Sequence, residues 1–137
     1  MRPFMDHVDV VVTSLERSLP FYRGLLEPLG VEYDHEVRGE RGETIHYLGG
    51  KGLIGAIGLR ERQADGDFDR YRVGLHHICF SADSRERVDE RAAWLREQGA
   101  ELESGPAEYA YTNGYYAVFF YDPDGLKLEI VHDPRYD

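Results

Sequence analysis

The sequence has a single cysteine and no apolar run long enough to cross a membrane. With one cysteine the chain cannot form an intrachain disulfide, and because Cys79 lies between Ile78 and Phe80 we expect a buried, unreactive thiol. At the N-terminus, charged residues such as Arg2 and Asp6 come before any apolar stretch of the length that a signal peptide needs. We therefore expect a cytoplasmic protein that has no membrane partner.

Basic residues are also scarce. The sequence has 16 Lys and Arg against 26 Asp and Glu, a formal charge of −10, which repels phosphate backbones, so we expect no nucleic-acid partner. At 137 residues with 42% hydrophobic side chains, the chain fits one ordinary domain with a real core. Aromatic residues are plentiful by contrast, with 10 Tyr and 6 Phe, and we expect part of this surface to line a small-molecule pocket.

The first half of the sequence predicts one strand, one helix and three further strands. Residues 5–12 alternate β-branched side chains with Asp and His, which favours a strand. Thr13 and Ser14 then offer capping hydroxyls to a helix whose apolar residues recur at helical spacing until Pro28 and Gly30 end it. Turns that contain glycine separate the three strands that follow, which are predicted at residues 31–38, 43–48 and 53–59.

The second half repeats this order after a polar linker at about residues 61–73. Residues 75–82 predict a strand, Asp83 and Ser84 cap a helix, and Gly99 ends it. The later strands are predicted at residues 100–103, 115–121 and 126–132. Aligning the halves pairs residues 6–8 with 76–78, Gly30 with Gly99, and 52–57 with 125–130.

The repeat predicts an α+β fold of two βαβββ modules. We expect one domain over residues 1–137, with module one at about 1–60 and module two at about 74–133. Each module has one sheet face that it cannot bury alone, so the two are expected to pair into a cupped, mixed-sheet partial barrel with the helices outside. The concave side would then form the binding site.

Three residues on the predicted first and last strands of the modules carry metal-binding side chains. Because side chains alternate along a strand, only one of His76 and His77 can face the cup. The repeat pairs His77 with His7 and so selects His77. Glu129 lies between apolar residues on the last strand, where an ionised carboxylate is costly unless it is paired or bound to a metal. Two imidazoles and one carboxylate are thus predicted to converge.

The segment at residues 119–129 resembles a family signature. It contains Asp-Pro-Asp-Gly at residues 122–125 and then Glu129, similar to the Asp-Pro-Asp-Gly-x-x-x-Glu motif of the vicinal-oxygen-chelate superfamily, the glyoxalase/bleomycin resistance protein/extradiol dioxygenase group. The likeness covers nearly the whole chain and implies the fold of that group. By itself, Asp-Pro-Asp-Gly is also a tight turn favoured for its backbone geometry.

The resemblance implies a divalent metal held by His7, His77 and Glu129, because the family places its ligands on the first and last strands of each module. Ala56 stands at the predicted fourth position, so the four-ligand set of metal-dependent glyoxalases is absent. Two His and one carboxylate resemble the site of extradiol dioxygenases, which favours Fe²⁺, while Mn²⁺, Ni²⁺, Co²⁺ and Zn²⁺ also suit these donors. The metal would chelate two vicinal oxygens of a substrate.

Other residues near this predicted site are assigned by position. Phe119 stands where extradiol enzymes carry a Tyr, which weakens that assignment. His46 is predicted to share the inward parity of Ala56 and to act as a general acid or base, and a structural histidine bonded to a neighbour is the equal alternative. Phe119, Tyr111 and Tyr115 are predicted to contact the substrate, although such rings also pair across hairpins. Residues off the predicted inward face, at strand ends or on the surface receive no role: His35, His76, His132, Asp6 and Asp9.

Together these residues lead to a divalent-metal-dependent enzyme, either a glyoxalase-like lyase or isomerase or a dioxygenase, that acts on a small oxygen-rich or aromatic molecule. The alternative is a non-catalytic protein that sequesters a drug or natural product in the aromatic cup, as bleomycin resistance proteins do. In this superfamily the two modules of one site come from one chain or from two, and a homodimer is expected.

Overall fold

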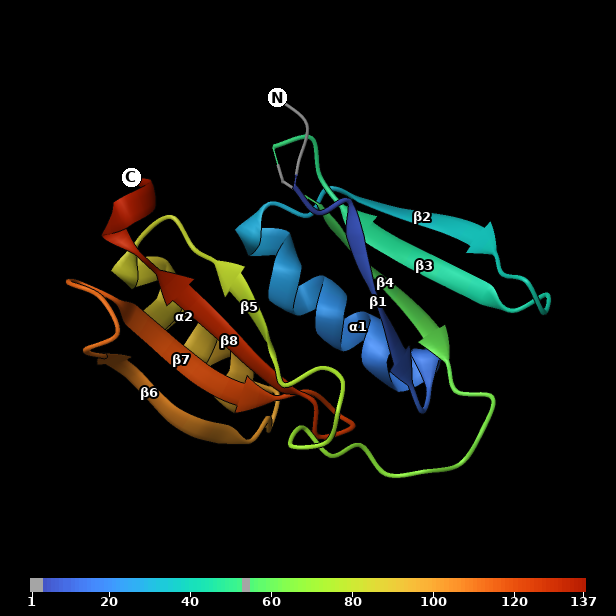
Figure 1. Ribbon diagram of the computed structural model, residues 1–137. Helices are drawn as coiled ribbons and strands as arrows, with labels where there is room; N and C mark the ends of the chain where they lie inside the picture. The colour runs from blue at the N-terminus through green and yellow to red at the C-terminus, as the bar shows by residue number, and fades with distance from the viewer. Residues whose placement is uncertain (1–3, 53–54) are drawn as a thin grey trace. The chain divides into compact units, whose positions relative to one another are not determined.

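The structure, a computed structural model, describes residues 4–52 and 55–137 and divides into two compact units (Figure 1). One unit ends at Gly66 and the other begins at Asp67, so each contains one of the predicted modules. The division falls inside the linker predicted at about residues 61–73. That the two units act together as one domain, with their sheets paired into a cup, stays a prediction.

Each unit runs strand, helix, and then three strands. The first contains β1 (His7–Val12), α1 (Leu15–Leu26), the 3-10 turn η1 (Glu27–Leu29), β2 (Tyr33–Arg38), β3 (Thr44–Gly49) and β4 (Ala56–Glu61). The second contains β5 (Ile78–Ser81), α2 (Arg85–Glu97), β6 (Leu102–Glu108), β7 (Tyr116–Tyr121), β8 (Lys127–His132) and the 3-10 turn η2 (Pro134–Tyr136). These elements confirm the α+β class and the βαβββ repeat. The strand predicted at 53–59 is found from Ala56, and Leu53 and Ile54 lie outside the described residues.

Both units build the same four-stranded mixed sheet. The strand orders are β1-β4-β3-β2 and β5-β8-β7-β6, and in each sheet the first strand of the module runs parallel to the last, whereas the other pairs are antiparallel. The first and last strands of a module are therefore neighbours. Those are the strands that carry the predicted metal ligands.

Serine hydroxyls begin both helices, as the sequence predicts. The Ser14 hydroxyl accepts a hydrogen bond from the backbone N–H of Arg17 at 3.3 Å, and the Ser84 hydroxyl accepts one from Arg87 at 3.1 Å. Gly99 follows α2 with a φ of +75°, a conformation that ends a helix and that glycine adopts without steric cost. Among the described helices, none is long and apolar enough to cross a membrane.

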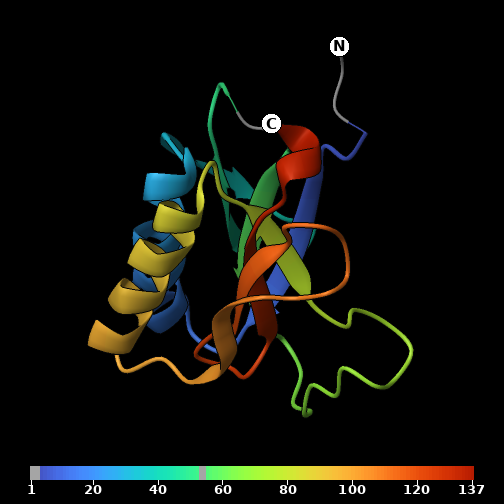
Figure 2. The ribbon, with the colours of Figure 1, turned by 90° about the vertical axis from the view of Figure 1, so that its left-hand side faces the viewer.

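One face of each sheet is covered by the helix of its own unit. Helix α2 contacts β6, β7 and β8 (Figure 2), and Phe120, Leu128 and Ile130 are fully buried. In the first unit α1 contacts β4, and Val10 and Leu59, which are direct partners in the β1–β4 pairing, are buried as well. Because side chains alternate along each strand, their neighbours point to the opposite face. We call this opposite face of each sheet the helix-free face.

Strand β6 is longer than the sequence predicts. The prediction ends at residue 103, whereas β6 continues through Gly105 and Pro106 to Glu108. A glycine and a proline normally argue against a strand, but β6 lies at the edge of its sheet, where a missing backbone donor is tolerated.

The helix caps provide a test of the fold. Ser84→Ala removes the hydroxyl that satisfies the first turn of α2, and we expect the free energy of unfolding to fall by about 1 kcal/mol. Chemical denaturation followed by circular dichroism measures the change. Ser81→Ala, at an exposed position of β5, is the control and should shift stability by less than about 0.5 kcal/mol. Equal losses in the two variants would contradict the capping role.

Candidate functional site

A buried carboxylate lies at the centre of the helix-free face of the second unit. Glu129, on β8, is 2% exposed. Its Oε2 lies 3.1 Å from Nε2 of His77, and its Oε1 accepts a hydrogen bond from the Tyr115 hydroxyl. The neighbouring His76 instead contacts Nδ1 of His77, with the two Nδ1 atoms 2.7 Å apart. The structure thus brings His77, rather than His76, against Glu129.

Aromatic rings surround this carboxylate. Phe119 is the direct partner of Glu129 in the β7–β8 pairing. Tyr109 meets Phe119 edge-on with ring centroids 5.3 Å apart and stacks on Tyr111 at 5.6 Å with an interplanar angle of 8°. Tyr111 in turn meets Tyr115 edge-on at 5.3 Å. The three residues predicted to contact a substrate therefore form one connected aromatic wall, in which Tyr111 is 66% exposed.

Two neighbours of Glu129 hold their protons more strongly than usual. Burial and the hydrogen bond to Glu129 raise the pKa of Tyr115. Cys79, which pairs with Glu129 across β5 and β8, is an exposed residue, so the expectation of a buried cysteine is wrong. The thiol group itself is desolvated, and this desolvation and the Glu129 carboxylate raise the pKa of Cys79. Both groups are therefore neutral beside the carboxylate at neutral pH.

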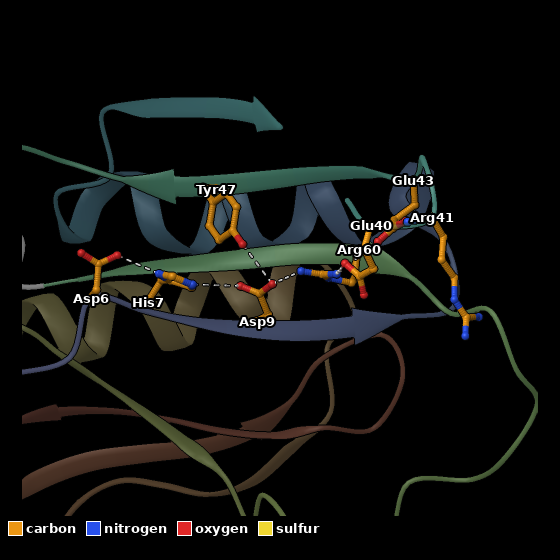
Figure 3. Close-up of polar contacts among 8 residues, drawn as sticks. All are labelled: Asp6, His7, Asp9, Glu40, Arg41, Glu43, Tyr47 and Arg60. Atoms are coloured by element: carbon orange, nitrogen blue, oxygen red, sulfur yellow. Dashed lines mark hydrogen bonds and ion pairs between the residues drawn. The ribbon is translucent and has the colours of Figure 1, made fainter. Parts of the chain in front are cut away.

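His7 lies on the helix-free face of the first unit. Its Nδ1 is 2.7 Å from Oδ1 of Asp6, and its Nε2 is 4.0 Å from Oδ1 of Asp9 (Figure 3). A carboxylate at Nδ1 favours the proton on that nitrogen and leaves the lone pair on Nε2, which is the tautomer that binds metals through Nε2. Asp6 and Asp9, which received no role from the sequence, both contact this histidine.

Asp9 is the centre of a polar cluster that the sequence analysis missed. The Tyr47 hydroxyl donates to Asp9 Oδ2 at 3.0 Å, and Arg60 donates to the same oxygen. Burial and the bond to Asp9 raise the pKa of Tyr47, and the bond to Asp9 raises the pKa of Arg60. The ring of Tyr47 also meets the ring of His7 edge-on at 5.1 Å. Counting in steps of two from His7 would have placed Asp9 on the same face.

A groove of about 600 Å³ opens on this face beside His7. His35, which received no role from the sequence, lies opposite Tyr47 in the β2–β3 pairing and lines this groove. The groove is lined by Asp6, His7, Tyr33, His35, Val37, Tyr47 and Ala56. It offers aromatic and apolar surface next to one predicted metal ligand.

His46 does not lie on this face. It is the direct partner of Leu59, which is buried on the helix-covered face, and its Nδ1 is 2.9 Å from Oδ1 of Asp34. Arg23, on α1, also bonds to Asp34. The prediction that His46 points to the same face as Ala56 is therefore wrong. The β3–β4 register pairs His46 with Leu59, which points to the opposite face from Ala56. The geometry favours the structural alternative.

The strand pairing also corrects the alignment of the two halves. His7 and His77 are equivalent, because each lies seven residues before the serine that caps the next helix. His7 is opposite Ala56, but the residue opposite Glu129 is Cys79, two positions after His77. The position equivalent to Glu129 therefore lies two residues beyond Ala56.

That position is Gly58. Glycine carries no carboxylate. As predicted, β4 therefore supplies no fourth ligand, but the position that lacks it is residue 58 and not residue 56. A Cβ at Gly58 would lie 2.4 Å from Asp9 Oδ1 and 2.5 Å from Tyr47 Cε1. The space that a side chain would enter there is thus filled by Asp9 and Tyr47.

The predicted metal ligands are found on two different units. His77 and Glu129 are in contact in the second unit, and His7 belongs to the first. Within residues 4–52 and 55–137, no group of three or more His, Cys, Asp or Glu gathers closely enough to hold an ion. The described contacts therefore supply a pair of donors in the second unit and one predicted donor in the first.

Comparison with known proteins finds relatives over nearly the whole chain. The family model of the Glyoxalase/Bleomycin resistance protein/Dioxygenase superfamily matches residues 4–130. The uncharacterized Bacillus subtilis (strain 168) protein YqjT is 32% identical over 129 residues, which are 93% of this chain and 97% of that protein. Among solved structures, a glyoxalase candidate from Bacillus halodurans is 31% identical, with a TM-score of 0.76 over 95% of this chain and 96% of its own. A glyoxylase/bleomycin resistance protein/dioxygenase domain from Frankia sp. EAN1pec is 27% identical, with a TM-score of 0.73 over 92% and 94%.

The bond between Tyr115 and Glu129 can be tested through stability. Tyr115→Phe removes a donor to a buried carboxylate, and hydrogen bonds to charged groups contribute about 1.5–3 kcal/mol, so we expect the free energy of unfolding to fall by about 2 kcal/mol. Tyr109→Phe is the matched control, because its hydroxyl donates to the neutral Ser104 at 2.8 Å, and the loss there should be about 1 kcal/mol or less. Urea unfolding measures both. A Tyr115 variant no less stable than the Tyr109 variant would contradict the assigned bond.

Proposed function

Because the chain belongs to the Glyoxalase/Bleomycin resistance protein/Dioxygenase superfamily, we propose that it is a divalent-metal-dependent enzyme that acts on a small oxygen-rich or aromatic substrate. The proposed reaction is a glyoxalase-like lyase or isomerase step, or a dioxygenation. Proteins of this superfamily bind small molecules and commonly use divalent metals, which supports the proposal. The homodimer expected from the resemblance stays a prediction.

The observation that carries the proposal is the contact between His77 and Glu129. Their facing atoms, Nε2 and Oε2, are 3.1 Å apart, and two ligands bonded at about 2.1 Å to one octahedral ion are about 3.0 Å apart. Glu129 is also almost fully buried, a position in which a carboxylate is costly without a cationic partner. The donor types and their spacing therefore fit a divalent ion.

We propose His7 as the third ligand beside His77 and Glu129. Its Nε2 lone pair is available because Asp6 is bonded to Nδ1. Fe²⁺ is the first choice for two histidines and one carboxylate, and Mn²⁺, Ni²⁺, Co²⁺ and Zn²⁺ suit the same donors. A bound ion would supply Lewis-acid polarisation to two vicinal oxygens of the substrate.

In this proposal the aromatic wall orients the Glu129 carboxylate and contacts the substrate. Tyr115 holds Oε1 of Glu129 and so leaves Oε2 to face His77. Phe119, beside Glu129, offers a ring on which an aromatic substrate can stack, but it can neither donate nor accept a proton. The exposed ring of Tyr111 extends this surface. His46, on the opposite face, has no part in the proposal.

Metal binding tests the ligand assignment. We expect the purified chain to bind about one divalent ion, and we expect His77→Ala to abolish retention because it removes a ligand. His76→Ala removes only the contact to Nδ1 of His77 and should weaken binding by no more than roughly 10- to 100-fold. Isothermal titration with Co²⁺ and elemental analysis measure both. Equal losses in the two variants, or no ion bound even after reconstitution, would overturn the assignment.

A second candidate function is ligand sequestration without catalysis. The groove of about 600 Å³ in the first unit favours it, because Tyr33, Tyr47 and Val37 offer flat aromatic and apolar surface to a planar molecule. On this hypothesis a drug or natural product binds whether or not a metal is present, and no bond changes.

One panel separates the two functions. Fe²⁺-reconstituted protein is mixed anaerobically and then with O₂ against catechols, hemithioacetals and polyaromatic or glycopeptide antibiotics, and both turnover and binding are followed. We expect turnover that chelators abolish. We also expect slow cleavage of simple catechol, because the side chain of Phe119 can neither donate nor accept a proton. Tight binding of an antibiotic by metal-free protein, without turnover of any compound, would favour sequestration instead.

A further inference from the structure

The first unit places a second metal-binding side chain beside His7. Asp9 lies two residues further along β1, so both side chains point to the helix-free face. Asp9 Oδ1 is 4.0 Å from His7 Nε2, and Figure 3 shows the two side chains turned toward each other. Donor atoms on one ion are about 3.0–3.4 Å apart when each bond is about 2.1 Å. A small side-chain rotation would let both atoms bind the same ion.

The two oxygens of Asp9 face different partners. Oδ2 accepts hydrogen bonds from Tyr47 at 3.0 Å and from Arg60, whereas Oδ1 is the oxygen that faces His7. A carboxylate that is oriented by donors at one oxygen and offers the other to an ion is typical of metal ligands.

The second unit contains the same arrangement. There Tyr115 donates to Oε1 of Glu129, and Oε2 faces Nε2 of His77 at 3.1 Å. In both units a tyrosine holds one carboxylate oxygen and a histidine nitrogen faces the other. The two carboxylates lie on different strands of their modules: Glu129 is on the last strand, β8, but Asp9 is on the first strand, β1.

Gly58 leaves room for the carboxylate of Asp9 on this face. It is the residue of β4 equivalent to Glu129, and Asp9 Oδ1 lies 2.4 Å from the point where its Cβ would be. Since no real Cβ tolerates an oxygen that close, a carboxylate from β4 and the observed position of Asp9 exclude each other. In the first unit β4 carries glycine at this position, and the carboxylate comes from β1.

The charges around Asp9 leave it able to attract a cation. Arg60 is the positive partner, but it also lies 3.2 Å from Glu43 Oε1 and 3.6 Å from Glu40 Oε2. One guanidinium thus faces three carboxylates, and the surplus negative charge favours a divalent ion nearby.

We infer that Asp9 is a metal ligand, supplied by β1 in place of the carboxylate missing from β4, and that it binds an ion together with His7. The inference rests on the proposed function and adds a ligand to it.

Titration of the full chain with Co²⁺ tests the ligand, because the visible absorption of Co²⁺ reports its ligand set independently of activity. Asp9→Asn keeps the size of the side chain and an oxygen for Tyr47 and Arg60 but removes the carboxylate. We expect Co²⁺ affinity to fall by more than the roughly 100-fold that the loss of a residue bonded only to a ligand can cause, and we expect the spectrum to change. Gly58→Ala should also weaken binding, because its methyl group displaces Oδ1 while the charge of Asp9 remains.

Two control variants separate a ligand from a structural ion pair. Glu43→Gln removes a negative charge from the same cluster without touching His7, and it should leave the Co²⁺ spectrum unchanged. Arg60→Gln frees Asp9 from its competing cation, and it should keep or tighten Co²⁺ binding. If Arg60→Gln weakens binding as much as Asp9→Asn, Asp9 acts through its ion pair and the inference is wrong.

The outcomes also distinguish the inference from the proposed function. Wild-type binding that His77→Ala abolishes, together with unchanged affinity and spectrum in Asp9→Asn, overturns the Asp9 ligand and leaves the metal enzyme standing. A wild-type chain that binds no Co²⁺ overturns both. Metal-free thermal unfolding of each variant shows that it is folded, and if Asp9→Asn is unfolded then Gly58→Ala decides the question.

Discussion

Covering one face of each sheet with a helix constrains everything on the other face. Strand side chains alternate. Once Val10 is buried on the face that α1 covers, and Leu128 and Ile130 are buried under α2, their neighbours along each strand can point only the other way. Asp9 and Glu129 are placed by this rule, although both are carboxylates in strands rich in apolar residues. The hydrophobic core thus determines which polar groups can meet.

The repeat and the order of elements could be predicted from the sequence, because hydrophobic periodicity, capping serines and turn glycines act locally. The register between neighbouring strands could not be predicted, because it depends on the length of the turns, which the hydrophobic pattern does not determine. Glu129 was found because apolar residues flank it on one strand. His46 was assigned to the wrong face, and Ala56 rather than Gly58 was predicted to be equivalent to Glu129. Both predictions counted residues across a turn.

The two units also show how one polar arrangement can be built at different depths. In each, a histidine nitrogen faces one oxygen of a carboxylate whose other oxygen accepts from a tyrosine; the trios are His77, Glu129, Tyr115 and His7, Asp9, Tyr47. Glu129 is 3% exposed at its side chain, whereas Asp9 is 26% exposed and shares Arg60. Because charges interact more strongly away from water, water screens the contacts of Glu129 less than those of Asp9.

Glycine on an inner strand normally weakens a sheet, since it leaves the backbone bare and flexible. In the first unit Gly58 and Gly49 lie on the two inner strands, and the rings of Tyr47 and Tyr33 lie over them, within 3 Å of where a Cβ would be. This is the pairing known as aromatic rescue, in which a ring shields the exposed peptide groups of a neighbouring glycine. Tyr47 therefore serves the sheet as well as the groove, and any exchange of this ring to admit a different ligand also uncovers the backbone of β4.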